Sequence, residues 1–177
     1  SRPVSLWLCL RFHQLPLQCL NRSEEQAVVV LAKQRVLRAN DYAAALGIRE
    51  DMGATTVRAL LADEPVQLLE RDTSAEARCL QQLCCWGYSI TPSLHTHGAD
   101  CLQLEIGSCL ALFRGMDLLL AEVSNGIASR GFRVEYGLAL TPGAAWLLSF
   151  SENDQANDYQ RPLQDRLTPL PLSLLSG

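Results

Sequence analysis

The chain is almost without lysine: Lys33 is the only one among its 15 basic residues, and the rest are arginines. Aromatic residues make up 6% of the 177 residues and charged residues 19%, whereas hydrophobic residues reach 48%. The formal net charge is −4. The shortage of lysine leaves one candidate for any chemistry that needs an ε-amine. The acidic balance excludes a uniformly basic nucleic-acid coat, and the apolar fraction excludes a mainly disordered chain.

Long apolar runs and the common catalytic motifs are absent as well. No run reaches the ~20 residues that span a bilayer, and the first residues lack the features of a secretory signal. The 7 cysteines occur largely within apolar stretches, where a thiol acts as a small hydrophobe. We therefore expect a soluble protein of the reducing cytoplasm rather than a disulfide scaffold. There is no Walker-type loop, GxGxxG, HExxH, GxSxG or CxxC motif.

Three local patterns suggest chemistry and are better explained by packing. The densest set of metal-ligating residue types is Cys84, Cys85, His95, His97 and Cys101. Zinc knuckles use paired ligands at two-to-four spacing, so this set is typical of packed thiols and a surface His-x-His. His13 lies beyond the strand that carries Cys9, and nothing orients it as a base. The segment 14–17 is similar to the start of a sliding-clamp-binding peptide, but we expect it to pack in the core.

Hydrophobic periodicity predicts alternating strands and helices. Strands are expected over 5–12, 27–31, 35–40, 66–69, 102–106 and 132–140. Helices are expected after His13, over 41–47, over 51–61, from Thr73 or Ser74, from about Asp117 to Gly131, and over 142–149. This order is typical of an α+β domain with helices on one face of its sheet.

Two details of these elements are specific. Glu76 lies three residues after Thr73, which is the spacing of a capping box. Gln103 and Glu105 alternate with apolar residues along 102–106, which predicts a strand with one buried and one exposed face.

Several segments, in order, resemble the Y-family translesion DNA polymerases. They are Leu46-Gly-Ile-Arg-Glu-Asp-Met52, Val66-Gln-Leu-Leu69, Tyr88-Ser-Ile-Thr-Pro92, Leu112-Phe-Arg-Gly115 and Gly137-Leu-Ala-Leu-Thr-Pro142. The stretch from Thr91 to Gly107 can be laid without gaps on the family's segment ending in SIDEAYLDVT. The resemblance covers about residues 5–150 and is nearest to the ImuB-like, catalytically inactive members of bacterial mutasomes.

The resemblance implies a domain arrangement. Residues 1–25 and 65–150 would form a ferredoxin-like palm with a mixed or antiparallel sheet and helices on one face. Residues 26–64 would form a small inserted fingers subdomain. Residues 151–177 would be a linker toward a thumb domain.

The metal site of the family is depleted in this chain. Active members carry two carboxylates in the first strand and an adjacent Asp-Glu pair in the later segment, where they hold two metal ions. The matching positions here are Cys9, Arg11, Asp100 and Cys101. Asp100 is the single remaining carboxylate, and the charge of Arg11 would repel a metal. The resemblance therefore implies vestigial positions with no catalytic residue, no metal and no cofactor; Mg²⁺ would be needed only by an active polymerase.

The nucleotide-binding positions of the family are depleted as well. Asp41 and Ala44 stand where the family has the tyrosine and arginine that hold the triphosphate, and Tyr42 is one place off. Gly143 stands where the family has a lysine before its last palm helix. A carboxylate at position 41 would repel a phosphate, so these positions are also expected to be vestigial.

The resemblance implies a non-catalytic scaffold in DNA repair and damage-induced (SOS) translesion synthesis. Such proteins bridge an ImuA-type RecA-like protein, a DnaE-type polymerase and the sliding clamp; this part of the chain would bind DNA weakly and no membrane. One alternative is a divergent, active translesion polymerase, a nucleotidyltransferase. Another is an unrelated ferredoxin-like protein-binding module, which we would favour if Cys9, Arg11 and Asp100 did not converge on one surface.

Overall fold

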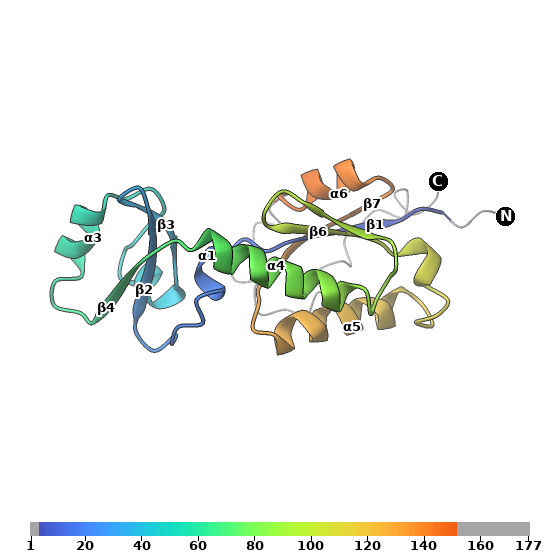
Figure 1. Ribbon diagram of the computed structural model, residues 1–177, viewed down its shortest axis with the longest axis horizontal. Helices are drawn as coiled ribbons and strands as arrows, with labels where there is room; N and C mark the ends of the chain where they lie inside the picture. Colours follow the sequence, from blue (N-terminus) through green and yellow to red (C-terminus); the bar gives the residue numbers. More distant parts are fainter. Residues whose placement is uncertain (1–3, 152–177) are drawn as a thin grey trace. The chain divides into compact units, whose positions relative to one another are not determined.

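The computed structural model describes residues 4–151, which divide into two compact units (Figure 1). One unit contains residues 4–13 and 80–151, and the other contains residues 14–79. The expected linker lies, from residue 152 onward, outside the described residues. No helix within residues 4–151 is long and apolar enough to cross a membrane.

The first unit is built on a four-stranded antiparallel sheet in the order β5-β6-β1-β7. Its strands are β1 (Trp7–Arg11), β5 (Leu94–His97), β6 (Cys101–Glu105) and β7 (Glu135–Ala139). Its helices are the later part of α4 (Thr73–Gly87), η1 (Gly107–Cys109), α5 (Met116–Ser129) and α6 (Pro142–Leu148). The α+β class and the antiparallel sheet are confirmed.

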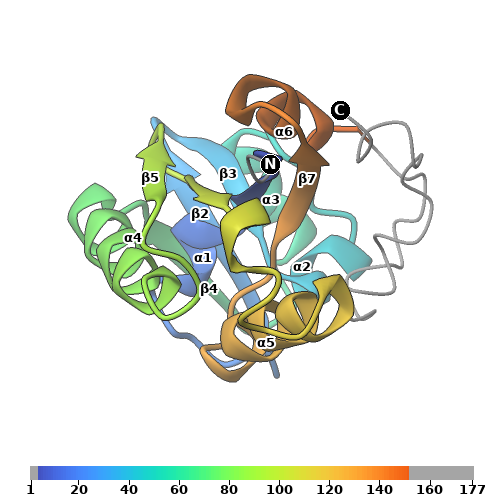
Figure 2. The ribbon, with the colours of Figure 1, turned by 90° about the vertical axis from the view of Figure 1, so that its right-hand side faces the viewer.

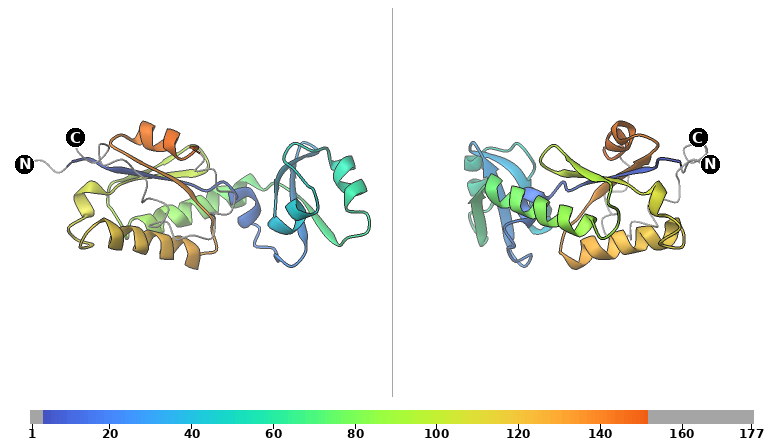
Figure 3. Two further views of the ribbon diagram at one scale, coloured as in Figure 1. Left: turned by 180° about the vertical axis from the view of Figure 1, so that it is seen from behind. Right: turned by 45° about the vertical axis from the view of Figure 1, so that its right-hand side comes forward.

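Helices cover both faces of this sheet, so the expectation of helices on one face is wrong. The later part of α4 and all of α5 lie on one side, and α6 lies on the other (Figures 1 and 3). Along β1, Leu8 and Leu10 alternate with Cys9 and Arg11, and all four are buried. Gln103, which was expected on an exposed face, is only 1% exposed. The polar face of the sheet is buried because α6 packs on it.

The second unit contains a three-stranded sheet in the order β3-β2-β4. Its elements are α1 (Leu15–Gln18), β2 (Ala27–Ala32), β3 (Arg35–Ala39), α2 (Asp41–Ala45), α3 (Ala54–Leu60), β4 (Val66–Glu70) and the start of α4. Small and branched side chains form its core: Ala27, Val29, Leu31, Val36, Ala43, Ile48, Ala54, Val57 and Leu61. In α1, Leu15 is 1% exposed, so the segment 14–17 packs in the interior as predicted.

The boundaries of the second unit differ from those predicted for the insertion. Residues 14–79 belong to it, rather than 26–64. The reason is strand pairing: β4 lies parallel to β2, with Val66 opposite Ala27. The segment 66–69 is a strand, as predicted, but it completes this second sheet instead of joining the first.

Helix boundaries follow local backbone conformation and capping. The last helix begins at Pro142 after the N-cap Thr141, and α5 ends just before Gly131, whose φ is +78°; both agree with the prediction. By contrast, α3 begins at Ala54 rather than at Asp51. Asp51 has φ of +69°, which lies outside the helical region.

The start of α4 is capped by a residue that the sequence analysis did not assign. Asp72 Oδ1 accepts a hydrogen bond of 2.9 Å from the backbone N–H of Ala75. Glu76 is buried and accepts two hydrogen bonds from the Arg71 guanidinium, at 3.0 and 2.7 Å. The capping box predicted for Thr73 and Glu76 is therefore replaced by an Asp cap and a bidentate ion pair.

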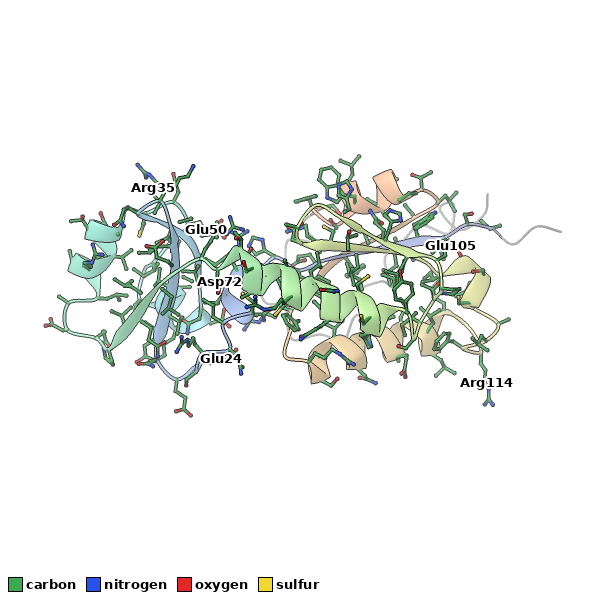
Figure 4. The ribbon with its side chains drawn as sticks, viewed as in Figure 1. Glu24, Arg35, Glu50, Asp72, Glu105 and Arg114 are labelled. Carbon is green, nitrogen blue, oxygen red and sulfur yellow. The ribbon has the colours of Figure 1, made fainter. Side chains whose placement is uncertain are left out.

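The Glu105 carboxylate connects the end of β6 to the segment before β1 (Figure 4). It accepts hydrogen bonds from the N–H groups of Leu6, at 3.2 Å, and Gly107, at 2.8 Å, and from the Ser108 hydroxyl, at 2.7 Å. Burial raises the pKa of Glu105, but these hydrogen bonds lower it more, so the pKa lies below its ordinary value.

We predict that Glu105→Gln lowers the free energy of unfolding at pH 7. The depressed pKa means that the carboxylate stabilises the fold at neutral pH and loses this effect as the pH falls through the folded-state pKa. The difference between wild type and variant should therefore shrink from pH 7 to pH 3, as measured by urea denaturation. Glu122→Gln, at an exposed position of α5, is the matched control and should change little. An equal difference at both pH values would contradict the prediction.

A glycine allows α4 and α5 to pack closely. A Cβ placed on Gly126 would overlap the indole of Trp86, which is 8% exposed. Glycine-to-alanine changes within helices usually stabilise a protein by ~1 kcal/mol. We predict the opposite sign for Gly126→Ala, a loss of about 1–2 kcal/mol, because overpacking outweighs the gain in helix propensity. Gly143→Ala in α6, where a Cβ meets no atom within 4 Å, should instead be neutral or stabilising in the same chemical denaturation assay.

Candidate functional site

The four predicted metal-site positions converge at one place on the first sheet. In the antiparallel register, Arg11 lies opposite Cys101 and Cys9 lies opposite Gln103. These side chains share the face that α6 covers. Asp100 precedes β6 in a turn, as predicted, and its Oδ1 accepts a hydrogen bond of 3.3 Å from the Cys101 thiol. The four positions therefore bring together a cation, two thiols and one carboxylate.

The guanidinium of Arg11 is used in attaching α6. Its Nη2 donates a hydrogen bond of 3.0 Å to the carbonyl of Ser149, the C-cap of α6, where a positive charge also favours the helix dipole. The same group lies 4.1 Å from the ring centroid of Phe150, and its Nη1 is 3.3 Å from His13 Nδ1. Arg11 is 9% exposed and forms no ion pair with a carboxylate among the described residues. The positive charge of Arg11 is therefore stabilised by the Ser149 carbonyl and by the neighbouring rings of Phe150 and His13.

Helix α6 lies beside β7 (Figure 2), and two further contacts fix it on the sheet. At the start of the helix, Gln103 Nε2 donates a hydrogen bond of 2.9 Å to the carbonyl of Pro142. In the middle, a Cβ on Gly137 of β7 would collide with the backbone of Ala145, so only glycine permits this approach. The Gln103 Oε1 and the Arg11 Nε are both buried without a hydrogen-bond partner. The close approach of the α6 backbone to Gly137 therefore covers the polar face of the sheet and buries these atoms.

The thiols of Cys9 and Cys101 are both fully buried and pack against Ala139 and Ala145. The neighbouring Cys101 thiol lowers the pKa of Cys9, with further lowering by the Ser149 side chain and the Arg11 charge; burial acts in the opposite direction. The neighbouring Cys9 thiol and burial raise the pKa of Cys101. The proton of the pair therefore stays on Cys101 more readily than on Cys9.

Aromatic rings surround this region on β5 and α6. The ring of His97 lies 5.1 Å from that of Trp146, and Trp146 lies 5.0 Å from Phe150. The ring of His95 lies 5.4 Å from that of Trp7, and the two rings are tilted by 57°. Both histidines are exposed and lie on an edge strand, in agreement with a surface His-x-His. Among the described residues, no group of three or more His, Cys, Asp or Glu side chains is arranged to hold a metal ion.

The expected nucleotide-site positions belong to two different units. Asp41 and Ala44 lie in α2 of the second unit, and Gly143 lies exposed in α6 of the first. The turn before α2 is organised by the buried Asn40. Its Oδ1 accepts hydrogen bonds from the N–H groups of Ala43, at 2.9 Å, and Val28, at 3.1 Å, and its Nδ2 donates to a carbonyl. The side chain that begins this helix is thus fully used in holding the fold together.

Comparison with known proteins identifies the family. The sequence model of the impB/mucB/samB family matches residues 13–150. The chain belongs to the impB/mucB/samB family. This is a family of Y-family polymerase-like proteins of DNA-damage tolerance and translesion synthesis. No curated protein matches the chain.

Solved structures of Y-family polymerases share the fold. An insertion ternary complex of Dbh DNA polymerase aligns with a TM-score of 0.65 at 13% identity, and a post-insertion binary complex of Dbh aligns with 0.67 at 14%. DinB from Sulfolobus solfataricus gives 0.62 at 14% identity. Each match covers 81% of this chain and 45% of the solved one, so the chain spans less than half of these polymerases. The sheet of the first unit is accordingly similar to the palm of a Y-family polymerase.

Membership of the impB/mucB/samB family removes the unrelated binding module from the alternatives, and so does the convergence of Cys9, Arg11 and Asp100. Within this palm, sequence reasoning missed the contacts that α6 makes. Gln103 was interpreted as an exposed strand residue, and Ser149 was not singled out at all. Gly137 could have indicated that a helix packs on this face, because glycine within a strand often marks the close approach of another backbone.

We predict that Arg11→Met loosens α6. The change keeps a long apolar stem over Phe150 but removes the hydrogen bond to Ser149, so we expect a loss of about 1–3 kcal/mol. Hydrogen exchange of the α6 amides should accelerate more than that of the α5 amides. Arg114→Met is the control, because Arg114 lies exposed before α5 and points away from the sheet (Figure 4). Unchanged exchange in α6 would show that Arg11 does not hold it.

Proposed function

We propose that this chain is the palm and fingers part of a non-catalytic, ImuB-like member of its family, acting as a scaffold in damage-induced mutagenesis. The observation that carries the proposal is the state of Arg11. By resemblance, position 11 corresponds to a metal-binding carboxylate of the family. In this chain it carries a buried guanidinium that is part of the attachment of α6. A residue in this role cannot turn away to admit a cation without releasing the helix.

The donor set around Arg11 does not suit two divalent cations. Two-metal phosphoryl transfer needs several carboxylates that bridge ions ~4 Å apart. Of the four family positions, only Asp100 is a carboxylate, and it accepts a hydrogen bond from Cys101. Magnesium prefers hard oxygen ligands, whereas Cys9 and Cys101 offer buried sulfur. We therefore derive no catalytic step through Mg²⁺ for this chain.

The nucleotide-binding positions support the same proposal. Asp41 places a negative side chain where the family has a phosphate-binding tyrosine, and Ala44 has no charge to offer in place of arginine. In α6, Gly143 has no side chain with which to contact a phosphate. These losses lie in both units, so a single local change in the fold does not account for them.

A non-catalytic scaffold acts by binding other proteins. By resemblance to ImuB-like proteins, the full-length protein would bridge an ImuA-type RecA-like protein, a DnaE-type polymerase and the sliding clamp in the cytoplasm. The formal charge of −4 also predicts weak DNA binding by this part, since phosphate contacts supply most of the affinity for nucleic acid.

The decisive experiment is nucleotide incorporation by the full-length protein that contains this chain. We expect no extension of any primer-template with Mg²⁺ or Mn²⁺, while an active Y-family polymerase extends the same substrates in parallel. Incorporation that is abolished by Asp100→Ala would overturn the proposal and favour the divergent, active polymerase. Incorporation that survives Asp100→Ala would indicate a contaminating polymerase, and the preparation would then be repurified until the two cases separate.

A further inference from the structure

Strand β5 lies at an edge of the first sheet and has no role in the contacts described so far (Figure 2). It pairs with β6 on one side, and among the described residues no strand pairs with its other side. Leu94 is half-buried, whereas His95, Thr96 and His97 are exposed. An edge strand of this kind presents unpaired backbone groups and is a template for the addition of another strand.

The pairing of β5 with β6 decides which backbone groups face outward. Ser93 lies opposite Glu105 in this register, and its carbonyl accepts a hydrogen bond of 2.9 Å from the Glu105 N–H. In an antiparallel ladder, hydrogen-bonded and non-hydrogen-bonded residue pairs alternate. His95 and His97 therefore direct their backbone groups to β6, whereas Leu94 and Thr96 direct theirs to the open edge. The N–H and carbonyl groups of these two residues have the spacing that an extended backbone can match.

Side chains support this edge from both faces of the sheet. On the face that α6 covers, the ring of His95 lies 5.4 Å from that of Trp7. On the same face, the ring of His97 lies 5.1 Å from that of Trp146. On the opposite face, Leu94 packs against the end of α4. These contacts fix the edge before a partner binds, so less conformational entropy is lost on association.

The surroundings of β5 lack formal charge. There is no Asp, Glu, Lys or Arg over 80–99, which includes the later part of α4 and all of β5, or over 136–151, which includes α6. Charged residues on an edge strand oppose unwanted pairing. The other edge strands of the two sheets each carry at least one: Arg35 and Arg38 on β3, Glu70 on β4 and Glu135 on β7. Strand β5 has none, and it contains no proline. This edge therefore suits an uncharged polypeptide strand rather than a nucleic acid, which needs cationic side chains.

We propose that the outer edge of β5 binds an extended, uncharged segment of a protein partner, which adds a further strand to the first sheet. Backbone hydrogen bonds to Leu94 and Thr96 supply the affinity in this mode of recognition, and alternate side chains supply the specificity. On the α6 face, apolar or aromatic side chains of the segment pack on His95 and His97. The inference rests on the proposed scaffold function, which requires a surface that binds another protein.

The test uses the full chain and a blocked peptide of alternating valine and threonine around a central tyrosine, labelled for fluorescence anisotropy. We expect saturable binding. At saturation, hydrogen exchange at the Leu94 and Thr96 amides should slow by about tenfold, as expected for one net hydrogen bond. The His95 and His97 amides, which already bond to β6, should change little. The same peptide N-methylated at consecutive central amides should not bind. Absence of binding by the unmodified peptide, or equal binding by the methylated one, would overturn the proposal.

A pair of substitutions at one position tests the edge from the side of the chain. Thr96→Pro removes an outward N–H and leaves the ladder with β6 in place, and proline is tolerated at such a position of an edge strand. It should weaken peptide binding by about tenfold or more, with little change in urea denaturation. Thr96→Val keeps the N–H and the shape of the side chain, so it should bind as wild type does. Equal binding by Thr96→Pro and Thr96→Val would contradict the proposal. Should the proline variant fail to fold, the methylated peptide decides.

Two further results identify a different occupant or a different function. A dimer in light scattering that Thr96→Pro dissociates would show a second copy on this edge and would overturn the assignment to a partner segment. Nucleotide incorporation does not use the outer edge of β5, so the two proposals fail separately. An inactive protein that does not bind the peptide overturns this inference alone. Incorporation abolished by Asp100→Ala, with peptide binding intact, overturns the scaffold function and leaves the binding edge standing.

Discussion

The palm of this protein depends on one close contact, the packing of α6 backbone against Gly137 of β7. Because position 137 carries no Cβ, the helix approaches the strand directly and closes over the polar face of the sheet. Arg11, Cys9 and Gln103 are buried as a result, and each is drawn into contacts with the helix or with its neighbours. The polar residues of the sheet therefore serve packing and attachment.

This closure changes the electrostatics of the face. In a two-metal polymerase the corresponding positions gather negative charge for cations that come from solvent. Here the positive charge belongs to the chain itself, as Arg11, and is stabilised by the Ser149 carbonyl and the Phe150 ring. Such a charge needs no exchangeable ion, and it couples position 11 of β1 to the helix that packs on it. The proposed scaffold function rests on this interior use of Arg11.

Much of the fold could be predicted from local pattern. The apolar alternation of 102–106 identified a strand, Gly131 marked the end of a helix, and Pro142 marked the start of another. One error came from long-range pairing, because the pattern of 66–69 predicts the same strand whether it joins β2 or the palm sheet. Another was local, because Asp72 and Thr73 are both residue types that cap helices. Gln103 was misplaced because a polar residue on an alternating strand is exposed only when nothing packs on that face.

The sequence by itself determined the family, the α+β class and the loss of carboxylates, because these depend on residue identity and on local periodicity. Only the tertiary structure decided that Cys9, Arg11, Asp100 and Cys101 share one place, that Arg11 holds α6, and that Cys9 and Cys101 belong to one buried cluster. Strand register and helix packing bring together residues about ninety positions apart, with Cys101 opposite Arg11. A linear pattern carries no direct record of such contacts, because many pairings satisfy the same periodicity.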